Sequence, residues 1–158
     1  MTSKRTVVLG AGLTAITAAV ATPLLAGSAA ASAHTFSLRM HSVQDGNVDN
    51  KPAGFSAGDD ELQKTRLTEA GKTVGWETGD CLATSRTKTS ATEICRFIFH
   101  VGSGELVSTG AIRSGKGGPG TFVLAITGGT GEYVGAQGEA RVTAVSHGSV
   151  PVTITASY

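Results

Sequence analysis

Residues 120–138 have the sequence GTFVLAITGGTGEYVGAQG, which is the most informative stretch of the chain for predicting its fold. An apolar run ends at Ile126, and a glycine-rich segment with Gly128, Gly129 and Gly131 follows it. Glycine accepts the positive φ angles that a tight turn requires. A strand pattern resumes after the turn, whereas a dinucleotide-binding glycine loop needs a helix there. The stretch therefore predicts two strands joined by a tight turn.

The same strand pattern extends in both directions from this turn. In 136–144, small apolar residues at every second position share one side and polar residues share the other, which is typical of a sheet with one buried face. The longest break, 44–60, is polar and is expected to be a loop. We predict eight strands, at 35–43, 61–69, 72–84, 92–101, 105–112, 120–127, 136–146 and 150–157. The expected fold is all-β, an eight-stranded antiparallel closed barrel, because closure removes the exposed edges that two open sheets would leave.

The first 33 residues have the three parts of an export signal. Lys4 and Arg5 precede an apolar run at 7–25, and small residues lead to an expected cleavage between Ala33 and His34. We therefore expect a cleavable helical signal peptide at 1–33 and one secreted domain at 34–158, with no membrane attachment after cleavage. An uncleaved N-terminal anchor is the alternative. The formal net charge is +1 with no basic stripe, so nothing favours a nucleic-acid partner.

The two cysteines, Cys81 and Cys95, both follow the expected signal. Outside the cytosol such a pair usually forms a disulfide, which we predict here. No His or further Cys stands at ligand spacing beside either one, so we expect no zinc site. Asp45, Asn47 and Asp49 alternate as in a calcium loop, but no glutamate stands at the twelfth position, and we expect no calcium site either.

Residues 120–138 resemble the signature of the allene oxide cyclase-like barrel superfamily, which includes the plant dirigent proteins. Segments at 58–59, 71–75, 79–81, 93–95 and 104–110 resemble its second to fifth strands, and exported bacterial members pair two cysteines at these places. The resemblance implies a barrel that holds an apolar small molecule and steers its cyclisation or isomerisation without a metal or organic cofactor. The alternatives are a noncatalytic lipid- or metabolite-binding barrel and a dirigent-like steering protein. The resemblance also implies a possible homo-oligomer.

The resemblance makes Arg39 and His41 candidate catalytic residues, because they fall where the plant cyclases place two polar lumen residues on the first strand. Simple patterning predicts the opposite orientation, with Phe36, Leu38 and Met40 inward and the polar residues exposed. We favour the patterning. Thr65 falls on or near a polar position of the family's second strand and is a candidate ligand contact.

Further candidate residues come from the third, fourth and sixth strands. Phe97, Phe99 and Phe122 are candidates for an apolar lumen that binds the ligand, with His100 then exposed. Glu77 is a third catalytic candidate. Facing inward it would be an acid with a raised pKa, and facing outward a solvated carboxylate, which we favour. Trp76 and Tyr133 are either rim contacts for a ligand or packing residues, and we favour packing.

Overall fold

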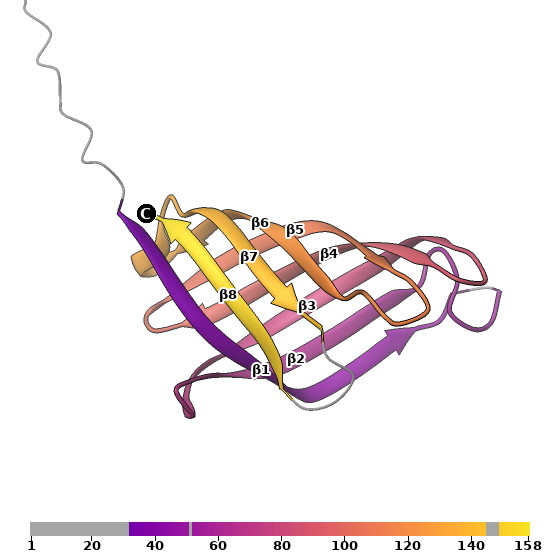
Figure 1. Ribbon diagram of the computed structural model, residues 1–158, viewed down its shortest axis with the longest axis horizontal. Helices are drawn as coiled ribbons and strands as arrows, with labels where there is room; N and C mark the ends of the chain where they lie inside the picture. The colour runs from indigo at the N-terminus through magenta and orange to yellow at the C-terminus, as the bar shows by residue number, and fades with distance from the viewer. Residues whose placement is uncertain (1–31, 51, 145–148) are drawn as a thin grey trace, which may run out of the picture.

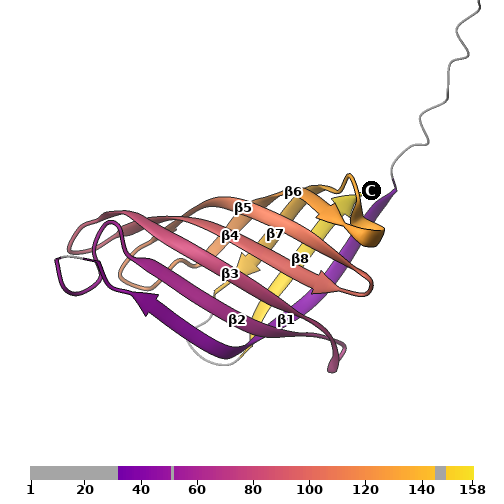
Figure 2. The same cartoon turned by 180° about the vertical axis from the view of Figure 1, so that it is seen from behind.

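The chain forms one closed barrel of eight antiparallel strands, as the sequence predicts. The computed structural model describes residues 32–50, 52–144 and 149–158. Each strand pairs with the next, and β8 returns to pair with β1 (Figure 1); the view from behind shows the side formed by β2 to β5 (Figure 2). The strands are β1 (Ala33–Val48), β2 (Asp60–Glu69), β3 (Lys72–Arg86), β4 (Ala91–Val101), β5 (Gly104–Ser114), β6 (Thr121–Thr130), β7 (Gln137–Thr143) and β8 (Val150–Ser157).

Two parts of the sequence-based expectation fall on residues that the structure does not describe. Residues 1–31 of the expected signal peptide lie outside the described part, and so do 145 and 146 at the end of the predicted seventh strand. Within 32–50, 52–144 and 149–158, no helix is long and apolar enough to cross a membrane.

The strand boundaries differ from the prediction mainly in β1 and β6. β1 runs to Val48 instead of ending at 43. A β-bulge between Ser42 and Gln44 shifts the register, and pairing with β2 continues beyond it. β6 runs through the predicted glycine turn to Thr130, since Gly128 and Gly129 still pair with β5. The chain then reverses through a 3-10 helix, η1 (Gly131–Tyr133), which the sequence analysis did not predict.

The hydrophobic core extends from the lumen to the end of the barrel where η1 lies, called the closed end here. Small inward residues of β7 and β8, such as Ala140 and Ala156, let this part of the barrel close tightly. Tyr133 of η1 is buried there and meets Phe36 and Tyr158 edge to face. The opposite end, called the open end, carries the loops that join β1 to β2, β3 to β4 and β5 to β6 (Figure 1).

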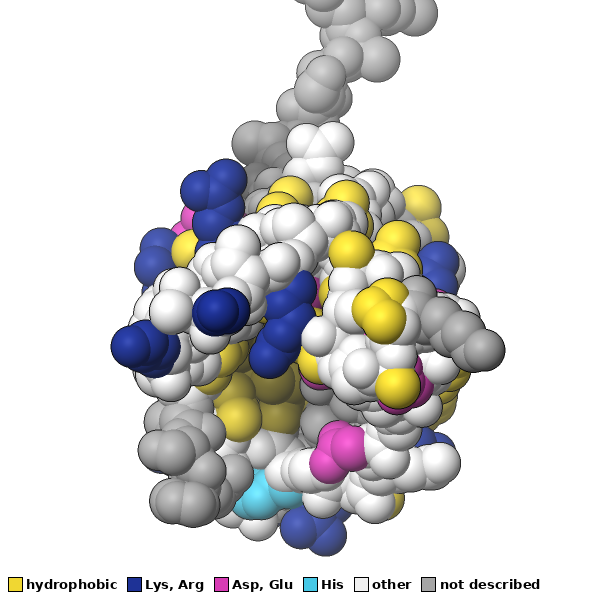
Figure 3. All heavy atoms as spheres, turned by 90° about the vertical axis from the view of Figure 1, so that its right-hand side faces the viewer, with side chains coloured by type: hydrophobic (Ala, Val, Ile, Leu, Met, Phe, Trp, Pro, Cys, Tyr) yellow, Lys and Arg dark blue, Asp and Glu magenta, His cyan; other side chains and the backbone are white. Residues whose placement is uncertain are grey.

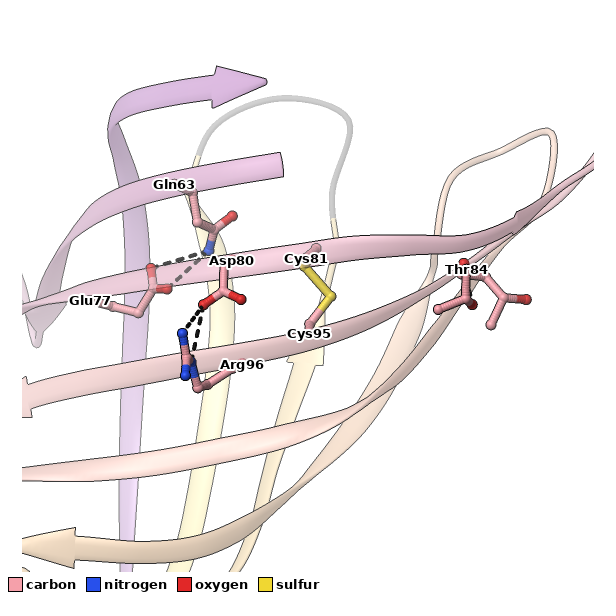
Figure 4. The surroundings of a disulfide bond; sticks show 8 residues. Gln63, Glu77, Asp80, Cys81, Thr84, Cys95 and Arg96 are labelled. Carbon is pink, nitrogen blue, oxygen red and sulfur yellow. Dashed lines mark hydrogen bonds and ion pairs between the residues drawn. A yellow bond between two sulfur atoms is a disulfide. The ribbon is translucent and has the colours of Figure 1, made fainter. Parts of the chain in front are cut away.

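The predicted disulfide is present and joins β3 to β4. Cys81 and Cys95 are direct cross-strand partners with Cα atoms 4.1 Å apart. Beside the disulfide, Arg96 donates two hydrogen bonds to Asp80 Oδ1, at 3.1 and 2.8 Å (Figure 4). Because Cys95 is buried and on the same face as Phe97 and Phe99, the disulfide fixes Cys81 and its alternate neighbours on the lumen side of β3.

Candidate functional site

A cavity of about 200 Å³ lies in the barrel lumen towards the open end. It adjoins a wider cavity of about 680 Å³ at the mouth, because Glu61, Glu93 and Pro119 line both. The view onto this end shows a hollow with apolar side chains at its floor and basic side chains at its rim (Figure 3). The lumen cavity is lined by Met40, Glu61, Gln63, Cys81, Glu93, Phe97, Phe99, Ile112, Pro119, Phe122, Val142, Ala144 and Val150.

The lumen cavity has one polar side, called the polar wall, made by Glu61, Gln63 and Glu93 from β2 and β4. Besides Cys81 of β3, the remaining strands and the residue after β7 contribute only apolar side chains to it: Met40, Ile112, Phe122, Val142, Ala144 and Val150. Antiparallel pairing of β2, β3 and β4 brings the polar wall together, since their inward residues lie in adjacent rows across the sheet. A molecule in the lumen would therefore meet an apolar surface on one side and carboxyl and amide groups on the other.

Glu77 is fully buried behind the polar wall, so the outward orientation that we favoured for it is wrong. Gln63 Nε2 donates to both carboxyl oxygens at 3.2 Å (Figure 4), and Thr65 Oγ1 donates to Oε2 at 2.8 Å. Burial raises the pKa of Glu77, and the hydrogen bonds from Thr65 and Gln63 oppose that rise. The side chain also packs over Gly79, where an added Cβ would lie 2.7 Å from Glu77 Oε1. Glu77 thus holds Gln63 in place at the cavity surface.

Glu93 is a candidate functional residue that was not singled out from the sequence. Its side chain lines both cavities, is only 8% exposed, and its Oε1 atom has no hydrogen-bond partner among the described residues. Its cross-strand neighbours, Ala83 and Ile112, are apolar. Burial raises the pKa of Glu93, the charge of Glu61 raises it further, and Arg86 opposes both. The signal was present in the sequence, because the alternation that places Cys95 inward also places Glu93 inward.

Arg39 and His41 lie on the outer face of β1 and do not line the lumen cavity, as patterning predicted. Arg39 is exposed and donates from Nη1 to Ser149 Oγ at 3.2 Å. His41 is half-buried, with Nε2 at 3.0 Å from Thr68 Oγ1. The inward positions that alternate with them belong to Leu38 and Met40, both buried. The structure therefore does not bring these two residues together with Glu77.

The candidate ligand contacts divide into two groups. Phe97, Phe99 and Phe122 line the lumen cavity. Thr65 is buried beside Glu77, to which it donates a hydrogen bond, and is absent from the cavity lining. Three of the four predicted contacts are thus at the cavity surface, and the fourth supports a carboxylate behind it.

The aromatic residues Trp76 and Tyr133 do not line the lumen cavity. Trp76 is on the outer face, where its ring stacks on His100 with centroids 3.3 Å apart, and His100 pairs with Glu105 at 2.9 Å. Tyr133 belongs to the core of the closed end, and burial raises its pKa to about 12. Both are packing residues, as we expected.

The mouth carries basic residues on two loops and on the end of β3. Arg86, Lys88 and Lys116 line the mouth cavity, and the Arg86 guanidinium lies over the Phe55 ring, 4.6 Å from its centroid. The loop that carries Phe55 is held by Asp59, a fully buried carboxylate that accepts backbone hydrogen bonds at 2.8 and 2.6 Å. Among residues 32–50, 52–144 and 149–158, no group of three His, Cys, Asp or Glu side chains is arranged to hold a metal ion.

Comparison with known proteins agrees with this geometry. No protein-family model and no curated protein matches the sequence. The solved structure of a pyocyanin demethylase is 28% identical, with a TM-score of 0.69 over 78% of this chain and 99% of that one. The pterocarpan synthase dirigent protein GePTS1 is 19% identical (TM-score 0.64; 87% and 95% covered), and the Diels Alderase AbmU from Streptomyces koyangensis is 12% identical (TM-score 0.60; 84% and 71% covered).

Fold and site together define a closed antiparallel barrel with a cavity at one end and carboxyl groups on one wall. The chain has the allene oxide cyclase-like and dirigent-like barrel fold, as the sequence resemblance implied. The identities of 19% and 12% establish this fold alone.

Proposed function

We propose that this barrel binds a small, mainly apolar ring compound in its lumen and steers the cyclisation or isomerisation of that compound. The observation that carries the proposal is the lumen cavity, whose apolar surface faces a nearly buried carboxyl group. Its volume of about 200 Å³ is below that of most drug-sized sites. A larger compound would extend into the adjoining mouth cavity.

Two effects would act on a bound compound. The apolar wall would restrict its conformations, so that one geometry of ring closure is favoured by orientation. Glu93 would serve as the acid or base, because it is at the cavity surface and burial moves its pKa up from that of a solvated carboxyl. Glu77 would act as a positioning residue, since its hydrogen bonds orient Gln63.

The similarity to the pyocyanin demethylase supports a ring compound as ligand and makes pyocyanin the first compound to test. We also propose that the protein works outside the cytosol. The Cys81–Cys95 disulfide supports this location, because such bonds persist in oxidising compartments.

The test of lumen binding uses two matched alanine substitutions. Ala144 lines the cavity and is half-buried, whereas Ala125 is exposed on the outer face of β6. Titration calorimetry with pyocyanin and phenazine should show binding to the wild type. Ala144→Phe should weaken it by about tenfold or more because the new ring fills the cavity, and Ala125→Phe should leave it unchanged.

Equal affinity in the wild type and Ala144→Phe, or no binding of either compound, would contradict the proposal. Catalysis is tested by liquid chromatography and mass spectrometry on bound compounds that, unlike the fully aromatic phenazine, have a bond that can close or shift. Turnover should fall by about 100-fold in Glu93→Gln, the lower end of the usual acid–base contribution. A compound that binds and is released unchanged would make the barrel a carrier.

A further inference from the structure

We propose that the compound held in the lumen carries a positive charge on its ring system and that the Glu93 carboxylate pairs with this charge. The inference rests on the proposed function, because it specifies the ligand class of the same cavity. It starts from Glu93, which is 8% exposed and whose Oε1 has no hydrogen-bond partner among the described residues. A buried carboxylate without a partner is costly, and a cationic ligand would supply one.

The charged groups around Glu93 do not fill that role. Glu61 on β2 lines the same two cavities and has the same sign. Arg86 on β3 lowers the pKa of Glu93 by its charge, but its guanidinium lies over Phe55, and no ion pair joins it to Glu93 among the described residues. Lys88 and Lys116 belong to the mouth cavity and not to the lumen. Ile112, the cross-strand neighbour of Glu93 on β5, is apolar.

The lumen cavity itself contains only negative ionisable groups. Of its lining residues, Glu61 and Glu93 alone can ionise, since Cys81 is in the disulfide. The buried Glu77 adds a third carboxyl group directly behind Gln63. A neutral ligand would further desolvate these carboxyl groups, whereas a cation would offset their charge where the dielectric constant is low.

The aromatic residues of the cavity provide a second, independent reason. Phe97, Phe99 and Phe122 all line it. Phenyl faces attract cations electrostatically, and aromatic sites are a common means of binding quaternary nitrogen compounds. A flat heteroaromatic cation meets both requirements, because its ring fills an apolar space while its charge faces the carboxyl groups. Because Glu61 and Glu93 line both cavities, the charged part of the ligand would lie where the lumen meets the mouth, and its ring would lie against the phenylalanines that line the lumen cavity alone.

The inference is tested with two probes of nearly the same shape, the cation N-methylquinolinium and the neutral 1-methylnaphthalene. At pH 8, titration calorimetry should give an affinity about tenfold higher for the cation, as expected for one partly screened ion pair, since N-methylquinolinium has no N–H to donate. Glu93→Gln should remove this preference, because it lowers the affinity for the cation and leaves the affinity for the neutral probe equal or higher. Glu139→Gln is the matched control, because Glu139 is exposed on the outer face of β7, and it should bind both probes as the wild type does.

The wild type provides a second measurement that needs no substitution. Binding of the cation favours the ionised carboxylate, so affinity should fall as the pH is lowered through the raised pKa of Glu93, and binding near that pKa should release protons. The neutral probe should show the opposite trend, because it favours the protonated carboxyl. Proton release is read from binding enthalpies in buffers with different ionisation enthalpies.

The outcomes separate this inference from the proposed function. Equal affinity for the two probes, or a preference for the cation that survives in Glu93→Gln, overturns the cationic ligand while lumen binding stands. If neither probe binds and pyocyanin and phenazine also fail, the proposed function itself is wrong. A cation affinity that does not depend on pH also overturns the pairing with Glu93.

Discussion

Reduction of the Cys81–Cys95 disulfide should lower the free energy of unfolding by about 3 kcal/mol. The two residues are 14 apart in sequence. In the chain-entropy model, a cross-link that closes a loop of about 15 residues lowers the entropy of the unfolded chain and so stabilises the folded protein by about 3 kcal/mol. The folded barrel should change little, because the two residues remain cross-strand partners in the β3–β4 ladder. Reduction therefore acts mainly on the unfolded state, and it should leave ligand binding nearly intact at temperatures well below the unfolding transition.

The measurement is unfolding in guanidinium chloride, followed by far-UV circular dichroism, for oxidised and reduced wild type. The Cys81→Ala/Cys95→Ala protein is the control and should not respond to reductant. It should be less stable than reduced wild type by about 1 kcal/mol, because buried Cys95 also loses the packing of its sulfur. A difference between oxidised and reduced protein below about 1 kcal/mol would refute the loop-closure reasoning.

Two other substitutions test buried polar groups. Burial raises the pKa of Glu77 above its ordinary value of 4.5, so the folded state favours the protonated form. The free energy of unfolding should therefore decline as the pH rises from below 4.5 through the folded pKa. Urea titrations across that range should show that Glu77→Gln removes this part of the decline. A wild type and variant with parallel pH profiles would contradict this. The fully buried Ser108 Oγ has no hydrogen-bond partner among the described residues. Ser108→Ala should therefore leave the free energy of unfolding unchanged or raise it by up to about 1 kcal/mol. A marked loss of stability in calorimetry would contradict this and would indicate a hydrogen bond to bound water.

The alternation of residue types was enough to predict the fold and most of the apolar lumen. The pattern in β7 and β8, with alanine, valine and isoleucine at every second position, is the pattern of burial that the structure has. Phe97 and Phe99 followed in the same way, because the other face of β4 carries Arg96 and His100. Arg39 and His41 show that local patterning was a better guide to orientation than an alignment to distant relatives.

The position of Glu77 was harder to predict, because neither face of β3 is clearly apolar. Trp76 and Leu82 are exposed on one face, while Glu77 and Gly79 lie inward on the other, so hydrophobicity alone favours the wrong orientation. The predicted disulfide implied the orientation of Glu77. A cysteine opposite the inward Cys95 must itself face inward, and Glu77 is four residues before Cys81 on the same side of the strand.

The amino-acid sequence by itself therefore determined the strands, the disulfide and the apolar residues of the lumen, because each depends on a local repeat of two or on cysteine chemistry. Only the tertiary structure decided which polar groups meet at the cavity. Glu61 and Gln63 of β2 are far in sequence from Glu93 of β4, and the three share one wall because of the register of β2, β3 and β4 and the curvature of the closed barrel. Register is a property of paired strands, so no single segment of the chain contains it.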